Sequence, residues 1–165
     1  MNTQRHSDVP IRILIADDDE RILECYQEAF DNADECGEVR TLHALDAELF
    51  ESDTEVPEKP VFEVVSCRQG DDAISLAREA ASDGHPFDVV ILDVRMPPGI
   101  DGVEAGSRIR EFDEEVEIVF VTGYSDVPRD EMERRVPPPM RLHYFNKPLS
   151  FIKLAKHVAG IVKAH

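Results

Sequence analysis

Five short apolar stretches alternate with segments of helical spacing, and this alternation is the feature that most constrains the fold. The apolar stretches lie at residues 11–16, 61–66, 89–93, 116–121 and 142–146. Apolar residues recur every three or four positions at 22–33, 73–81, 103–112, 126–135 and 150–162. Strands that alternate with helices form a parallel sheet covered on both faces. The pattern predicts one α/β domain, a doubly wound three-layer sandwich.

The third stretch ends on a carboxylate. Val89 to Leu92 run without a polar break, which is typical of a strand buried on both faces. Asp93 follows, and the prolines and glycines between residues 97 and 102 then turn the chain. Reactive groups in open α/β sheets lie just past the carboxyl ends of the strands. Asp93 is therefore a candidate nucleophile or metal ligand, although by itself it could equally cap the next helix.

A run of acids follows the first predicted strand. Asp17, Asp18 and Asp19 are adjacent, and a helix that starts here needs only one of them, Asp18 or Asp19, as its cap. Carboxylates packed this closely repel one another, and a divalent cation would relieve the repulsion. An exposed acidic turn is the alternative that this run alone leaves open.

Polar groups also end the fourth and fifth strands, whereas the second offers no obvious reactive group. Thr122 and Gly123 supply a hydroxyl and an unobstructed N–H, and Lys147 supplies a cation suited to a phosphoryl oxygen. Three carboxylates without a histidine ligand favour Mg²⁺ or Mn²⁺. Phosphoryl transfer depends mainly on positioning and charge neutralisation. The set therefore indicates a site that holds a phosphoryl group on Asp93.

The amino-acid composition limits which binding partners the chain can have. The formal net charge of −17 argues against nucleic acid or an anionic membrane as a direct partner. Residues 134–165 nevertheless contain no Asp or Glu, so the C-terminal segment is basic. Three cysteines without a CxxC pair predict a reduced, cytoplasmic setting. The six histidines show no HxxxH or HExxH spacing. We expect a flexible leader at 1–10 and a loop at 51–60. Between them the spacing near 42–50 predicts a short helix or an extension of the first helix.

The chain resembles the receiver domain of two-component response regulators. The resemblance rests on an ordered set of residues: Asp17-Asp18, Asp93 followed by Met96-Pro97, Thr122, and Lys147-Pro148. The resemblance covers the chain from Ile11 to about Val162, so we expect a receiver domain at 11–163 with an insertion at 31–60. It implies a flavodoxin-like (βα)5 fold with strand order 2-1-3-4-5. It also implies that Asp93 accepts a phosphoryl group from phosphohistidine on a sensor histidine kinase or phosphotransfer protein.

The resemblance assigns roles to the other residues. Asp18, Asp93 and the backbone carbonyl of Arg95 would bind Mg²⁺, with Asp17 acting through a water molecule. Thr122, Gly123 and Lys147 would serve the phosphoryl group, and Tyr144 matches the family's switch aromatic. Phosphorylation would then change the surface of the fourth helix, fifth strand and fifth helix. On that surface we expect a weak homodimer, in which acidic residues of one helix pair with lysines of the other.

Two other functions compete with this one. A phosphatase of the haloacid-dehalogenase kind needs a second Asp two residues after the nucleophile, where this chain has Arg95. A pseudo-receiver usually lacks one of the acidic pair, the acceptor or the lysine, and all are present here. We therefore expect a phosphoacceptor domain limited to self-phosphotransfer and autodephosphorylation, either free-standing or the start of a longer protein. The loop at 96–102 is one residue longer than the family pattern, and Pro137-Pro138-Pro139 shortens the fourth helical region.

Overall fold

Five parallel strands form one sheet in the order β2-β1-β3-β4-β5. The computed structural model describes residues 9–33, 60–123 and 126–164. Within these ranges the strands are β1 (Ile11–Ala16), β2 (Phe62–Cys67), β3 (Val89–Asp93), β4 (Glu117–Thr122) and β5 (Leu142–Asn146). The predicted fold class and the strand order 2-1-3-4-5 are confirmed, and each strand lies within one residue of its expected bounds.

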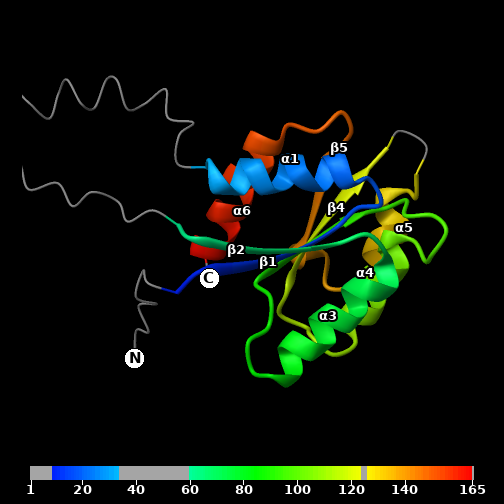
Figure 1. Cartoon of the computed structure of the whole chain (residues 1–165). Coiled ribbons are helices and arrows are strands. Elements are labelled where there is room, and N and C mark those ends of the chain that lie inside the picture. Colours follow the sequence, from blue (N-terminus) through cyan, green and yellow to red (C-terminus); the bar gives the residue numbers. More distant parts are fainter. Residues whose placement is uncertain (1–8, 34–59, 124–125, 165) are drawn as a thin grey trace, which may run out of the picture.

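Helices cover both faces of the sheet (Figure 1). One face carries α1 (Glu20–Asp31) and α6 (Phe151–Lys163), and the other carries α3 (Gly70–Ser82), α4 (Gly102–Arg110) and α5 (Arg129–Arg135). Because side chains alternate along a strand, Ile13 and Ile15 pack toward α1 and α6, whereas Leu14 packs toward the other three helices. The central strands β3 and β4 are buried throughout. The sheet is thus held between two apolar layers.

Local sequence signals set several helix ends. The carboxylate of Asp19 accepts a hydrogen bond from the N–H of Arg21 at 3.0 Å and caps α1. The hydroxyl of Ser150 accepts one from the N–H of Lys153 at 3.4 Å and caps α6. Gly84, just past the end of α3, has φ of 77°, which glycine adopts without strain. These three signals were predicted from the sequence.

The start of the helix expected at 126–135 was wrong. In the structure α5 begins at Arg129, because the proline at 128 disfavours helical backbone at Val127. A 3-10 turn (Pro139–Arg141) begins at the last residue of the proline run, so the fourth helical region is short, as expected.

Three other expectations fall wholly or mostly outside the described residues. They are the leader at 1–10, the insertion at 31–60 and the helix near 42–50. None of the helices in the described ranges has the length and apolar character that a membrane crossing requires.

Candidate functional site

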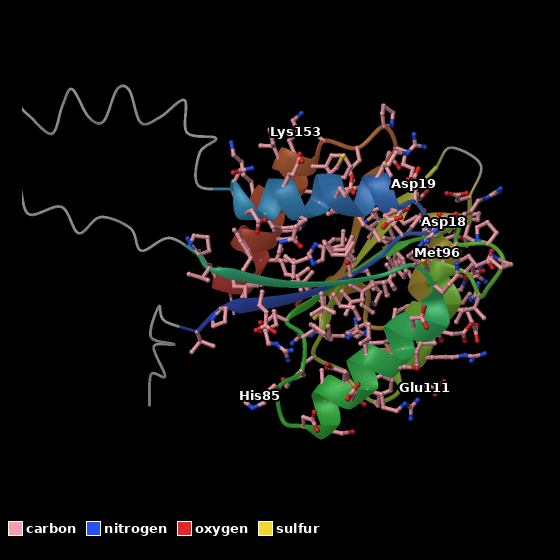
Figure 2. All side chains as sticks on the ribbon, viewed as in Figure 1. Asp18, Asp19, His85, Met96, Glu111 and Lys153 are labelled. Carbon is pink, nitrogen blue, oxygen red and sulfur yellow. The ribbon has the colours of Figure 1, made fainter. Side chains whose placement is uncertain are left out.

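The carboxyl ends of the strands bring the predicted acids together. In the sheet Ala16 lies opposite Leu92, so Asp17 and Asp93 follow at the same edge. One carboxylate oxygen from each of Asp17, Asp18 and Asp93 lies within 4.8 Å of the others. Figure 2 shows Asp18 at this end of the molecule, close to the start of α1. We call these three residues the acidic cluster.

Asp17 is the most buried member of the acidic cluster, with 1% of its surface exposed. Its Oδ1 accepts the N–H of Asp19 at 2.9 Å, whereas its Oδ2 has no hydrogen-bond partner among the described residues. Burial raises the pKa of Asp17 to about 6, with help from the charge of Asp93 and against the Asp19 hydrogen bond. A buried oxygen without a donor is costly. A hard divalent cation suits this donor set, so the residues fit the predicted Mg²⁺.

Asp93 is buried at the end of β3 and is held by a cation. The Nζ of Lys147 donates to its Oδ2 at 3.0 Å, and the N–H of Arg95 donates to its Oδ1 at 3.3 Å. Burial raises the pKa of Asp93, although Lys147 acts in the opposite sense. Burial would lower the pKa of Lys147, but the contact with Asp93 outweighs it and the pKa is raised. Lys147 therefore stays charged beside the candidate nucleophile.

Thr122 and Gly123 lie at the same edge, but their donors are engaged. The Thr122 hydroxyl donates to the carbonyl of Gly123 at 2.9 Å. The N–H of Gly123, which we expected to be unobstructed, donates to the carboxylate of Asp126. The Asp126 side chain is only 5% exposed, and its Oδ1 lies 2.5 Å from Nε of Arg95. An anion that uses these donors must displace both contacts.

Asp126 was missed by the sequence analysis as a site residue. It fell within a predicted helix, and residue spacing does not indicate which way such a side chain points. The structure also places the side chain of Arg95 toward Asp126, while its N–H donates to Asp93. The two loops that follow β3 and β4 are thereby joined.

Gln69 is a second residue that the sequence analysis missed. It precedes α3, and its amide makes two hydrogen bonds to the loop that follows Asp93. Its Nε2 donates to the carbonyl of Pro97 at 3.3 Å, and its Oε1 accepts the N–H of Gly99 at 3.1 Å. A Cβ on Gly99 would lie 2.6 Å from that oxygen, so a larger residue there would have to displace the Gln69 amide. The turn after β2, where the sequence offered no reactive group, thus holds this loop in place by hydrogen bonds.

Tyr144 lies half-buried on β5 between the site edge and α5. Its partner across the sheet is Phe120, and their ring centroids are 6.2 Å apart. Thr122 is two residues after Phe120, so Thr122 and Tyr144 share a face of the sheet. The guanidinium of Arg129 lies 4.3 Å from the Tyr144 ring centroid. The predicted switch role of Tyr144 stays a prediction.

Residues 46–159 match the family model described as the response regulator receiver domain. The match spans more than half of the chain and begins after β1, so Asp17 and Asp18 lie outside it. A search of the curated proteins gave no match.

Solved structures give the fold independently. A response regulator receiver protein from Sinorhizobium medicae is 21% identical with a TM-score of 0.61, over 94% of this chain and 96% of that one. A CheY-like receiver domain from Methanospirillum hungatei is 16% identical with a TM-score of 0.62, over 94% and 96%. A CheX–CheY–BeF3–Mg²⁺ complex from Borrelia burgdorferi is 17% identical with a TM-score of 0.61, over 93% and 90%. At these identities the similarity is one of fold.

Proposed function

Because the chain belongs to the response regulator receiver domain family, the CheY-like domains of two-component signalling, we propose that Asp93 is its phosphoacceptor. One observation carries the proposal. Asp93 is a buried carboxylate at a strand end, with Lys147 Nζ at 3.0 Å and two further acids gathered beside it. A buried carboxylate that faces a fixed cation is suited to attack a phosphoryl group whose charge that cation opposes.

The donor would be phosphohistidine on a sensor histidine kinase or phosphotransfer protein. One carboxylate oxygen of Asp93 attacks phosphorus, a P–O bond forms as the P–N bond breaks, and the imidazole leaves with the electron pair. The Lys147 cation opposes the charge on the transferred oxygens. The Thr122 hydroxyl can donate to one of those oxygens once it turns from the carbonyl of Gly123. Release of Asp126 frees the Gly123 N–H for another.

The acidic cluster would hold Mg²⁺ or Mn²⁺. Its ligands would come from Asp17, Asp18, Asp93 and the backbone carbonyl of Arg95. The ion would supply positive charge where adjacent carboxylates otherwise repel a phosphate. The buried Oδ2 of Asp17, which lacks a donor in the described part of the chain, supports this assignment. So does the presence of Mg²⁺ with BeF3 in the Borrelia complex of the same fold.

The geometry favours phosphoacceptance over the two rival functions. A haloacid-dehalogenase-type phosphatase would need a carboxyl group at residue 95, and the arginine found there pairs with Asp126. A pseudo-receiver would lack part of the site, whereas both early acids, the acceptor and the lysine lie together here.

The surface that responds would comprise α5, β5 and α6, with Tyr144 between them. Acidic residues of α5 already pair with arginines of the same helix, Glu133 with Arg129 at 3.1 Å and Asp130 with Arg134 at 3.7 Å. Acid-to-base pairing between two copies would compete with these contacts. A homodimer on this surface should therefore be weak. Sedimentation with and without beryllofluoride tests it, and no change in mass would argue against it.

The acceptor is tested by intact-mass analysis with Mg²⁺ and phosphoramidate, whose P–N bond resembles that of phosphohistidine. The wild-type chain should gain one phosphoryl group, and EDTA should prevent the gain. Asp93→Asn should abolish labelling, whereas the matched control Asp83→Asn, at the exposed end of α3, should leave it unchanged. Labelling that persists in Asp93→Asn would refute the assignment.

A further inference from the structure

A second group of polar side chains lies at the opposite edge of the sheet, between β4, β5 and α6. Glu117, the first residue of β4, is 3% exposed. Its Oε1 accepts a hydrogen bond from Arg141 at 2.9 Å, and its Oε2 lies 2.8 Å from Nε2 of His143. A carboxylate is an acceptor, so the proton of the imidazole belongs on Nε2. In the neutral ring the lone pair is then on Nδ1.

That lone pair faces a second imidazole. Nδ1 of His143 lies 2.9 Å from Nε2 of His157 on α6, so Nε2 of His157 donates the proton of this hydrogen bond. A metal ion bound between the two nitrogens would replace that proton, which would move to Nδ1 of His157. The His157 ring also packs edge-on against Phe145, with centroids 5.4 Å apart, and Phe145 shares a face of β5 with His143. His157 is exposed, and 17% of the His143 side chain is exposed.

We propose that His143 and His157 form a two-imidazole site for a transition-metal ion such as Zn²⁺. Imidazole nitrogen is a preferred ligand of this ion. Histidines that bind metals usually donate their other N–H to a carboxylate, which fixes the ring and raises its basicity, and Glu117 occupies that place for His143. Zn–N distances of about 2.0–2.1 Å in a tetrahedral site need the two nitrogens only a few tenths of an ångström farther apart. Water would complete the coordination.

This site differs in chemistry from the acidic cluster. The acidic cluster offers only oxygen atoms and suits Mg²⁺, whereas the histidine pair offers only nitrogen. A bound ion would also link β5 to α6, two elements that already pack together through apolar contacts such as that of Phe145 with His157. Binding should therefore raise the melting temperature without a rearrangement of the fold.

The test is a Zn²⁺ titration of the full chain, followed by ¹⁵N NMR of the imidazole rings and by bound-metal analysis after dialysis. The resonances of His143 and His157 should shift together, and His157→Ala should bind one zinc ion fewer than wild type. The matched control His85→Ala removes an exposed histidine that precedes β3 and is not part of the pair, and it should bind as wild type does. Asp18→Asn, which weakens the acidic cluster, should keep the imidazole shifts.

Two results would overturn the proposal. One is an equal zinc content in wild type and His157→Ala. The other is a set of imidazole resonances that stay in place while zinc binds elsewhere. His157 is exposed, so its replacement by alanine should fold normally, and His143→Ala provides a second variant with the same expected loss.

Discussion

Two buried carboxylates at opposite edges of the same sheet differ in how far their hydrogen bonding is satisfied. Both oxygens of Glu117 have partners, Arg141 and His143. Asp17 is equally buried, yet its Oδ2 has none in the part of the chain that the structure describes. Burial alone therefore does not distinguish a structural acid from a functional one. The unsatisfied acid lies beside Asp93, the proposed phosphoacceptor, where a bound cation would interact with its free oxygen. The satisfied acid ties β4 to β5 through Arg141 and His143.

The largest effect on stability is expected at the satisfied carboxylate. Glu117→Ala should lower the free energy of unfolding by about 3 kcal/mol, because Arg141 loses its buried partner and His143 its acceptor. Urea unfolding measures the change, and Glu115→Ala, at an exposed position, should change it by less than about 0.5 kcal/mol. Equal losses in the two variants would show that Glu117 contributes no more to stability than an exposed acid does.

Replacing the unsatisfied carboxylate, Asp17, should have the opposite effect and increase stability. In EDTA at pH 7.5, Asp17→Asn should raise the free energy of unfolding by about 1–3 kcal/mol. The upper value corresponds to a pKa raised from 3.8 to about 6. An acid with a raised folded-state pKa binds its proton more tightly when folded. Its favourable contribution is present below the unfolded pKa and is lost as the pH rises from about 4 to about 6.

The difference in stability between Asp17→Asn and wild type should therefore grow across that pH window and then level off. Mg²⁺ at pH 7.5 should reduce the difference by stabilising wild type. Chemical unfolding at several pH values, each with EDTA and with Mg²⁺, gives these quantities. A difference that does not depend on pH would show that burial does not destabilise the charged form of Asp17.

The smallest change in stability is expected at Lys147. Its side chain is 42% exposed, so Lys147→Met should cost at most about 1 kcal/mol of unfolding free energy despite the contact with Asp93. Labelling by phosphoramidate should slow by about 10²-fold, as for the loss of a charge-stabilising donor. Lys153→Met, on the exposed surface of α6, is the matched control for both measurements. Unimpaired labelling in Lys147→Met would assign the lysine to the fold alone.

The sequence predicted those parts of the site that follow from sheet topology. Parallel strands end at one edge, so Asp17, Asp93, Thr122 and Lys147 could be placed together without coordinates. Gln69 and Asp126 could not be predicted, because the direction of a loop side chain depends on contacts with distant segments.

The histidine pair was missed for a related reason. His143 and His157 are 14 residues apart and meet only because α6 packs beside β5. The absence of HxxxH spacing excludes pairs within one helix and says nothing about pairs between elements. The start of α5 was misplaced because the helical pattern outweighed the proline signal at residue 128.

The direction in which α1 runs has a consequence for how the chain tolerates insertions. α1 starts beside Asp18 and ends at Asp31, and β2 starts at Phe62, paired with the first residue of β1. The connection between them therefore leaves and re-enters at the edge opposite Asp93. We therefore expect that sequence can be added there without altering the loops that carry the proposed site residues. A reporter protein grafted between residues 34 and 59 should leave phosphoramidate labelling at the parental rate, which intact mass would measure.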